Sequence, residues 1–381
     1  MSRKLVLHIG THKTGTTAIQ NTLAANRTAL GRQGYVYPLA SMHFKGVQDS
    51  RNAYFLGRLV KDAVKPGSIP ADKLQLAQTC RREIAAYADA PEDVILSDER
   101  LWYSSTGYAR YWDALRACLE GMGFAEFRII VYLRRQDRFA EALWNQFVKG
   151  DTRLTDSLAT YLASDTVSRI CNYAEGLDAL AAVFGKKALS VRIFDRAQMT
   201  GADVVPDFLD TVGVDSSDFA DLREKERNVR LSNDAVEVKR LINASPAYRS
   251  LPNFMSAPLL EYSSAHPESG KTNLLPATER ARFLARFEKG NAYVAREYLG
   301  IPDSVLFGPE KADGYPDWDP CSESLRQALA FALDELFSRN SELHGVTGRG
   351  MRGKGGGKGL ADAAHSLGSR TKEAVKRALG R

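Results

Sequence analysis

The sequence has no long hydrophobic run and few cysteines, and both absences exclude classes of protein. No stretch of the 381 residues approaches the roughly 18 apolar residues that a membrane-spanning helix needs. The basic start, MSRKLVLHIG, has too short an apolar run for a signal peptide. The four cysteines form no CxxC pair, which argues against a zinc knuckle or a disulfide scaffold and predicts reduced, mostly buried thiols. They are Cys80, Cys118, Cys171 and Cys321. We therefore expect a cytoplasmic protein.

Most of the chain also lacks net charge, because the positive charge is concentrated at the C-terminal end. Residues 346–381 contain nine Lys or Arg and two acidic residues, a net charge of +7, while the whole chain carries +6. A basic tail of this kind indicates an anionic partner surface. Lipid headgroups and nucleic acid both fit that description, and nucleic acid is the less favoured of the two.

The tail divides into two segments. Residues 346–359 are rich in glycine and basic residues, which predicts a flexible linker. Residues 360–381 place apolar residues at helical spacing opposite Lys and Arg. This pattern predicts either an amphipathic helix at the inner membrane surface or a disordered tail, because the apolar face is mostly alanine and Gly368 interrupts it.

Residues 1–345 are expected to form one α/β domain. Near-continuous apolar strands that alternate with amphipathic helices are typical of a mostly parallel sheet with helices on both faces, as in P-loop folds. A helical C-terminal part follows, and the Ser- and Pro-rich residues 245–276 predict a long loop. Strands are expected near 4–9, 34–38, 94–97, 127–133 and 188–194. Helices are expected at 16–30, 109–122, 137–149, 170–184, 203–213, 232–243, 277–287, 290–299 and 323–338.

The segment HIGTHKTGTTAIQ joins the first strand to the first helix and predicts an anion site. Backbone N–H groups at a helix N-terminus bind phosphate, and small residues let its oxygens approach closely. Gly10 and Gly15 have the spacing of a nucleotide-triphosphate P-loop, but Thr16 stands where such a loop has lysine. Lys13 lies two residues before Gly15 instead, within reach of the bridging oxygen of a phosphate-linked leaving group.

A second motif combines the strongest strand with two arginines and a helix. The segment FRIIVYLRRQDRFAEALWNQF ends its strand at Arg134 and Arg135, and either guanidinium can make a bidentate phosphate contact.

Together these motifs resemble the sulfotransferases that use 3′-phosphoadenosine 5′-phosphosulfate (PAPS), in particular the bacterial, carbohydrate-sulfotransferase-like branch. Their phosphosulfate loop, Lys-(Ser/Thr)-Gly-Thr-Thr, is similar to Lys13-Thr14-Gly15-Thr16-Thr17. Bacterial members often have proline before the lysine, where this chain has His12. The resemblance continues in FGKKALSVRIFDR, DFLDTVGV and NAYVAREYLG, and covers about residues 4–308.

The family's second signature places a serine eight residues after the strand-end arginine, on the following helix. Counting from Arg134 gives Ala142, a small residue without a hydroxyl, and Asn145 or Gln146 would have to replace the missing contact. The resemblance thus implies that position 142 and Arg134 bind the 3′-phosphate of the nucleotide.

The resemblance implies sulfuryl transfer from PAPS to a hydroxyl or amine, with no metal required. Its nucleotide-binding residues would be Lys13, Thr14, Gly15, Thr16, Thr17, Arg134 and Ala142. Lys13 would also stabilise the departing phosphate oxygen. Glu99, just after the strand at 94–97, is the favoured base. Asp98, His12 and His43 are the alternatives.

Two other functions stay open at this point. One is a nucleotide kinase or NTPase with an aberrant P-loop, in which Asp98 is the candidate magnesium ligand. The other is a non-catalytic module that acts on membranes or nucleic acid through its basic tail. For the sulfotransferase, the sequence leaves the acceptor open among glycans, lipids and small molecules, with a glycan or lipid favoured. It also leaves the oligomeric state open.

Overall fold

The computed structural model describes residues 4–220, 230–249, 252–303, 305–308 and 315–350. Their contacts divide the chain into two compact units. The first comprises Met1–Trp144, Leu158–Asn228 and Leu275–Gly314, and the second comprises Asn145–Ser157, Val229–Leu274 and Tyr315–Arg381. Each unit combines segments that are distant in the sequence, and the single α/β domain expected over residues 1–345 stays a prediction.

The first unit is built on a five-stranded sheet with the strand order β2-β3-β1-β4-β5. Its strands are β1 (Lys4–His8), β2 (Tyr35–Val36), β3 (Asp93–Ser97), β4 (Glu126–Leu133) and β5 (Leu189–Ile193). Every pairing is parallel, which confirms the predicted α/β fold. The first strand lies at the centre, so the loop that follows it emerges at the carboxyl edge between β3 and β4. Ligands of open parallel sheets bind at such an edge.

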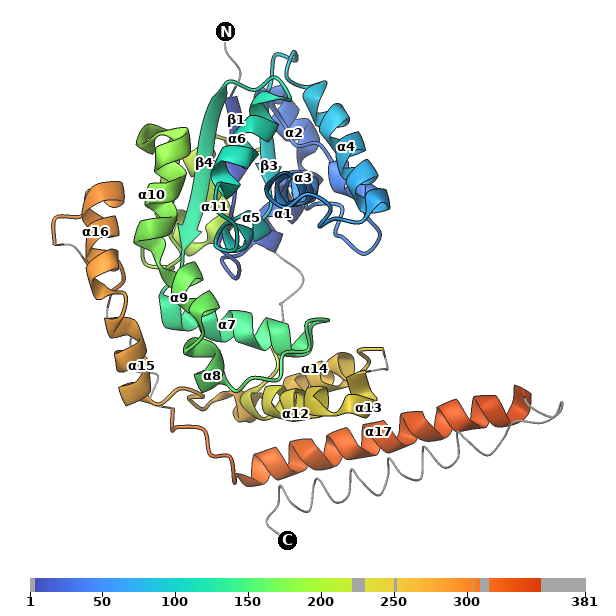
Figure 1. The fold of residues 1–381 in the computed structure, drawn as a ribbon. Helices are drawn as coiled ribbons and strands as arrows, with labels where there is room; N and C mark the ends of the chain where they lie inside the picture. Colours follow the sequence, from blue (N-terminus) through green and yellow to red (C-terminus); the bar gives the residue numbers. More distant parts are fainter. Residues whose placement is uncertain (1–3, 221–229, 250–251, 304, 309–314, 351–381) are drawn as a thin grey trace. The chain divides into compact units, whose positions relative to one another are not determined.

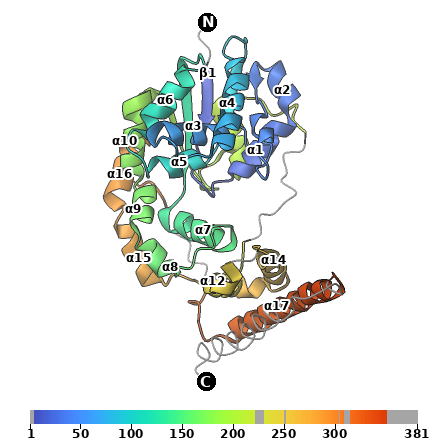
Figure 2. The same cartoon turned by 45° about the vertical axis from the view of Figure 1, so that its right-hand side comes forward.

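Alternate residues of β1 enter two apolar cores, one on each face of the sheet. Helices cover both faces of this sheet (Figure 1). Leu5 and Leu7 belong to the larger core, and Val6 belongs to the smaller one. The larger core is covered by α3 (Tyr54–Val64), α4 (Ala71–Ala85), α5 (Arg100–Ser105), α6 (Tyr111–Glu120), α10 (Tyr173–Phe184) and α16 (Glu288–Leu299). The smaller core is covered by α1 (Thr16–Ala25), α2 (Arg27–Arg32) and α11 (Val204–Val212), and Figure 2 shows these layers from a second direction.

The remaining helices of the first unit are short, apart from α7 (Gln136–Lys149), whose residues after Trp144 belong to the second unit. The short helices of the first unit are η1 (Ala40–His43), α8 (Leu158–Leu162), α9 (Asp165–Cys171), η2 (Lys186–Ala188), η3 (Thr200–Ala202) and α15 (Ala277–Ala285).

Two predicted helices are each broken at an asparagine. The helix expected at 16–30 is divided at Asn26, whose side chain donates to the carbonyl of Thr22. The helix expected at 170–184 is divided at Asn172, whose side chain accepts the N–H of Glu175 and begins α10. Asparagine side chains compete with helical hydrogen bonds in this way, so periodicity alone misses the break.

The second unit is helical, and it overturns the long loop expected at 245–276. Its elements are α12 (Asn233–Ala244), α13 (Pro246–Arg249), α14 (Ser256–Ala265), η4 (Pro267–Gly270) and α17 (Glu323–Gly350). In α14, Pro258 lies in the first turn, where its missing N–H costs nothing. The hydroxyls of Ser263 and Ser264 donate to carbonyls four residues back, so these residues continue the helix instead of ending it.

The last described helix is longer than predicted. It was expected at 323–338 but runs as α17 to Gly350, so residues 346–350 of the predicted linker are helical. A glycine costs about 1 kcal/mol within a helix but does not by itself end one. The rest of the linker and the tail at 360–381 lie outside the described residues. No helix in the described ranges has the length and apolar character needed to cross a membrane.

Candidate active site

The phosphate-loop candidate begins as an extension of β1. The N–H of Ile9 donates to the carbonyl of Ile130 at 3.1 Å, and the N–H of Thr11 donates to the carbonyl of Tyr132 at 2.9 Å. The N–H of Tyr132 returns a hydrogen bond of 3.0 Å to the carbonyl of Gly10. These bonds attach the loop to β4 beyond the formal end of β1, so its position is determined by the sheet.

Gly10 brings the loop against Glu99, and no other residue type fits there. Its φ is +81°, and a Cβ at this position would lie 2.7 Å from the Cβ of Glu99 and 2.9 Å from its Cα. The close backbone approach therefore explains the glycine and holds the two segments that carry Lys13 and Glu99 together.

We expect Gly10→Ala to lower the free energy of unfolding by about 2–4 kcal/mol, because it adds a steric overlap to an unfavourable φ. Gly34→Ala is the matched control, since Gly34 has the same φ of +81° with nothing within 4 Å of the added methyl group. It should cost only about 1 kcal/mol. Urea unfolding of both variants measures the difference, and equal losses would mean that the contact with Glu99 does not constrain the loop.

Lys13 adopts a left-handed backbone conformation, with φ of +64°, which is uncommon for a residue with a side chain. Arg134 donates to the backbone carbonyl of Lys13 at 2.9 Å. The Thr14 hydroxyl donates to the carbonyl of Thr11 at 2.6 Å and supports the same turn. The two predicted motifs thus meet, with Arg134 holding the backbone from which the lysine side chain projects.

The first helix leaves polar groups at its N-terminus without protein partners. Its N-cap, Gly15, has a φ of +72° and supplies no side-chain cap. The hydroxyl of Thr16 is buried and makes no hydrogen bond to the protein. The first N–H groups of any helix lack intrahelical partners, and the helix dipole favours an anion there. Thr17 is half-buried beside it. This end of α1 fits the phosphate end of a nucleotide, while Thr14 uses its hydroxyl proton within the loop.

Arg134 is a partly buried cation. Burial, and then the positive charge of Arg138, lower the pKa of its guanidinium. Its guanidinium lies over the ring of Phe194, 5.6 Å from the centroid. The hydroxyl of Tyr173 donates to its backbone carbonyl at 2.6 Å, which anchors the end of β4. An anionic ligand would stabilise a cation held in this way, because it would compensate the loss of contact with water.

Of the two neighbouring carboxylates after β3, only Glu99 is accessible. Asp98 is 1% exposed, is paired with Arg51, and accepts the N–H of Arg100 at 2.7 Å. Glu99 is 20% exposed and lies 3.5 Å from the other guanidinium nitrogen of Arg51. Its second oxygen accepts from Gln20 at 3.4 Å. This arrangement makes Asp98 a structural carboxylate and leaves Glu99 as the carboxylate that a ligand can reach.

The two candidate histidines differ in environment. His12 is buried, with the ring of Tyr103 at 5.7 Å, and burial followed by the charge of Arg51 lowers its pKa to about 3. A group that binds its proton so weakly is a poor base near neutral pH. The imidazole of His43 instead contacts Glu83 of α4 at 2.8 Å.

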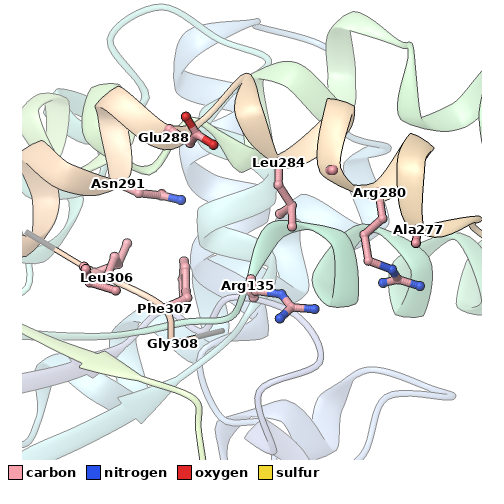
Figure 3. Close-up of a pocket in the computed structure, with 11 residues that line it drawn as sticks. Arg135, Ala277, Arg280, Leu284, Glu288, Asn291, Leu306, Phe307 and Gly308 are labelled. Carbon is pink, nitrogen blue, oxygen red and sulfur yellow. The ribbon is translucent and has the colours of Figure 1, made fainter. Parts of the chain in front are cut away.

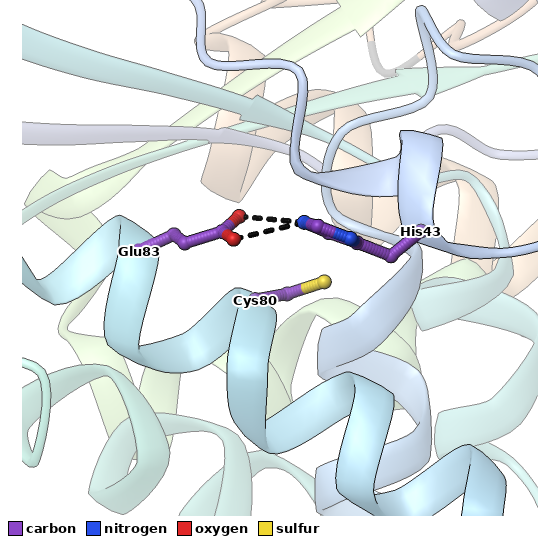
Figure 4. Close-up of side chains that lie close together, drawn as sticks. All are labelled: His43, Cys80 and Glu83. Carbon is purple, nitrogen blue, oxygen red and sulfur yellow. Dashed lines mark hydrogen bonds and ion pairs between the residues drawn. The ribbon is translucent and has the colours of Figure 1, made fainter.

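His43 belongs to a cluster that has the donor types of a metal site. His43, Cys80 and Glu83 offer ligand atoms within 4.8 Å of one another (Figure 4). The Cys80 thiol donates to the carbonyl of Ala40 at 3.0 Å, and burial raises its pKa to about 12. Each group of the cluster therefore has a protein partner as it stands. All four cysteines are free, and two of them, Cys80 and Cys171, are buried.

Arg135 points to a different place from Arg134. It makes a two-point ion pair with Asp137, at 2.8 Å for both contacts, and Arg280 pairs with the same carboxylate. Both arginines line a pocket of about 470 Å³ with Asn291 and Phe307 (Figure 3). The neighbouring Arg134 and Arg135 thus lie in different environments. Among the described interactions, only Arg134 contacts the phosphate loop.

Ala142 lies half-exposed on α7 and itself carries no hydroxyl. The Asn145 amide, offered as a substitute, donates to the carbonyl of Leu231 at 3.0 Å. Gln146 is half-exposed in the last turns of the same helix.

Sequence reasoning missed three residues that position Glu99 and its neighbours. Arg51 bridges both carboxylates, Gln20 reaches Ser97 and Glu99, and Asn52 accepts the N–H of Ser97 at 2.8 Å. Gln20 does lie within the quoted loop–helix segment, but Arg51 and Asn52 lie in a loop with no motif.

Comparisons with known proteins give limited guidance. No protein-family model matches the chain. An uncharacterized protein of Archaeoglobus fulgidus is 27% identical over 217 residues, which cover 56% of each chain, so this chain spans about half the length of that curated relative. A crystal structure of a sulfotransferase from Alicyclobacillus acidocaldarius matches 69% of this chain and 97% of its own, with 15% identity and a TM-score of 0.36. Likeness at this level carries no argument about function, which has to come from the site.

Proposed function

We propose that this protein is a sulfotransferase that moves a sulfuryl group from PAPS to a hydroxyl or amine of an acceptor. The observation that carries the proposal is the meeting of four features at one sheet edge. They are the left-handed Lys13, the unpartnered hydroxyl of Thr16, the partly buried guanidinium of Arg134 and the accessible carboxylate of Glu99. A phosphate-linked leaving group, its binding site and a base are the requirements of sulfuryl transfer.

In the proposed reaction the acceptor oxygen or nitrogen attacks sulfur in line with the bond that breaks. Its proton passes to the carboxylate of Glu99. The bond between sulfur and the bridging phosphate oxygen breaks, and its electron pair stays on the phosphate of adenosine 3′,5′-bisphosphate. Lys13 and the N–H groups at the start of α1 stabilise that developing charge. Arg134 would bind the 3′-phosphate or hold the loop. No metal is needed for these steps.

The kinase or NTPase alternative is less well supported. Its candidate magnesium ligand, Asp98, is buried and already bound by Arg51 and a backbone N–H. Thr16 also occupies the position where a P-loop needs lysine. The tail-dependent alternative depends on residues outside the described ranges and stays a prediction, as does contact of residues 360–381 with a membrane.

Thermal unfolding without metal tests the nucleotide site. Adenosine 3′,5′-bisphosphate at about 100 times its dissociation constant should add roughly 2.7 kcal/mol to the free energy of unfolding, a rise of a few degrees. Lys13→Ala and Arg134→Ala should each remove most of this rise, whereas Arg135→Gln should keep it relative to its own baseline. Stabilisation by Mg-ATP alone would favour the kinase, and no stabilisation by either nucleotide would refute the proposed function.

A further inference from the structure

Three arginine side chains surround the ring of Tyr54 next to the candidate base. The guanidinium carbons of Arg51, Arg58 and Arg100 lie 5.1, 4.6 and 5.4 Å from the ring centroid. Tyr54 begins α3, and Arg100 begins α5 directly after Glu99. We call Arg51, Arg58 and Arg100 the arginine cluster. Arg51 and Arg58 lie close to Tyr54 in the sequence, on the loop before α3 and on α3 itself, whereas Arg100 at the start of α5 is brought to the ring by the tertiary fold.

The cluster has more positive charge than its protein partners neutralise. Arg51 is paired with Asp98 and Glu99. In the described part of the chain, no carboxylate lies within ion-pair distance of Arg58 or Arg100. Arg58 donates to the hydroxyl of Tyr54, and its Nε is buried without a hydrogen-bond partner, as is the Nε of Arg51. Cations gathered this closely repel one another unless an anion joins them.

The cluster lies at the proposed reaction centre. Arg51 joins it to Glu99 through the 3.5 Å contact. The charges of Arg51, Arg100 and Lys13 all act on the imidazole of His12 in the phosphate loop. An anion bound by Arg58 and Arg100 would therefore lie beside Glu99, to which the acceptor must bring its hydroxyl or amine if Glu99 is the base.

We propose that the acceptor of this enzyme is anionic, with a carboxylate or sulfate ester near the hydroxyl or amine that receives the sulfuryl group. This inference rests on the proposed function and specifies its substrate class. Arg58 and Arg100 bind the anionic group of the acceptor. Arg51 holds Glu99 and completes the positive surface. Guanidinium groups suit both anions, since their planar N–H donors match two oxygens at once.

Calorimetric titration tests this proposal without requiring turnover. The probes are a tetrasaccharide containing glucuronic acid, the same compound with its carboxylates reduced to alcohols, and the reduced compound carrying sulfate esters. Each is titrated into the full chain with adenosine 3′,5′-bisphosphate present. We expect one or both charged forms to bind at least about ten-fold more tightly than the neutral form. The stronger of the two identifies the preferred anion.

The variants Arg58→Gln and Arg100→Gln should each weaken binding of the charged form about ten-fold and leave binding of the neutral form unchanged. Arg27→Gln, an exposed arginine on α2, is the matched control and should change neither. Arg100 is exposed, so its variant remains informative if Arg58→Gln fails to fold. Equal or absent binding of charged and neutral forms overturns the inference, as does a charge preference that survives both substitutions. The melting experiment with adenosine 3′,5′-bisphosphate tests the nucleotide site independently of the acceptor. Failure of the proposed function can therefore be distinguished from failure of the proposed acceptor class.

Discussion

Replacing Lys13 by alanine is expected to slow sulfuryl transfer by roughly 10²- to 10³-fold while the protein stays folded. The lysine has its catalytic value only as charge develops on the leaving phosphate, so the loss should appear in kcat as well as in kcat/KM. The rate is followed as transfer of a radiolabelled sulfuryl group from PAPS to the acceptor.

Lys13→Gly separates the role of the charge from that of the backbone. Glycine accepts a φ of +64° without the cost of about 1 kcal/mol that alanine keeps there. Lys13→Gly should therefore be as inactive as Lys13→Ala yet unfold at the same or a higher temperature. Retention of more than a tenth of the wild-type rate in both variants would remove Lys13 from the mechanism.

The second large effect is expected for Glu99→Gln, which should lower kcat by roughly 10²- to 10⁴-fold. In this variant no carboxylate remains to take the proton from the hydroxyl or amine of the acceptor. Arg51 keeps its pairing with Asp98 in this variant, so folding should be little affected. The bisphosphate-induced melting shift should also be retained.

Asp98→Asn is the matched comparison, and it should act on stability. Removing one partner of a buried ion pair costs about 3–5 kcal/mol because the other charge stays buried without compensation. Asp98 is 1% exposed and Glu99 is 20% exposed, so the neighbouring substitutions should separate into a folding defect and a catalytic defect. A normal rate in Glu99→Gln would assign the base elsewhere.

Much of the fold was predictable because its signals are local. Strands β1, β3 and β4 each contain an apolar run, and the glycines of the candidate phosphate loop mark where the chain turns between β1 and α1. The errors in the predicted helix boundaries arose where hydrogen bonds of individual side chains override what the local composition and periodicity suggest. Asn26 and Asn172 break helices, and the serines of α14 support one.

The sequence by itself determined the parallel α/β sheet and the phosphate loop with Lys13 and Thr16. The reason is that strand periodicity and a strand–loop–helix turn depend on neighbouring residues. Only the tertiary structure decided how the site is assembled. It set Arg134 on the carbonyl of Lys13 and Gly10 against Glu99. It also brought Arg100 of α5 to the ring of Tyr54 on α3, since the packing of helices onto a sheet brings together residues that are distant in the sequence.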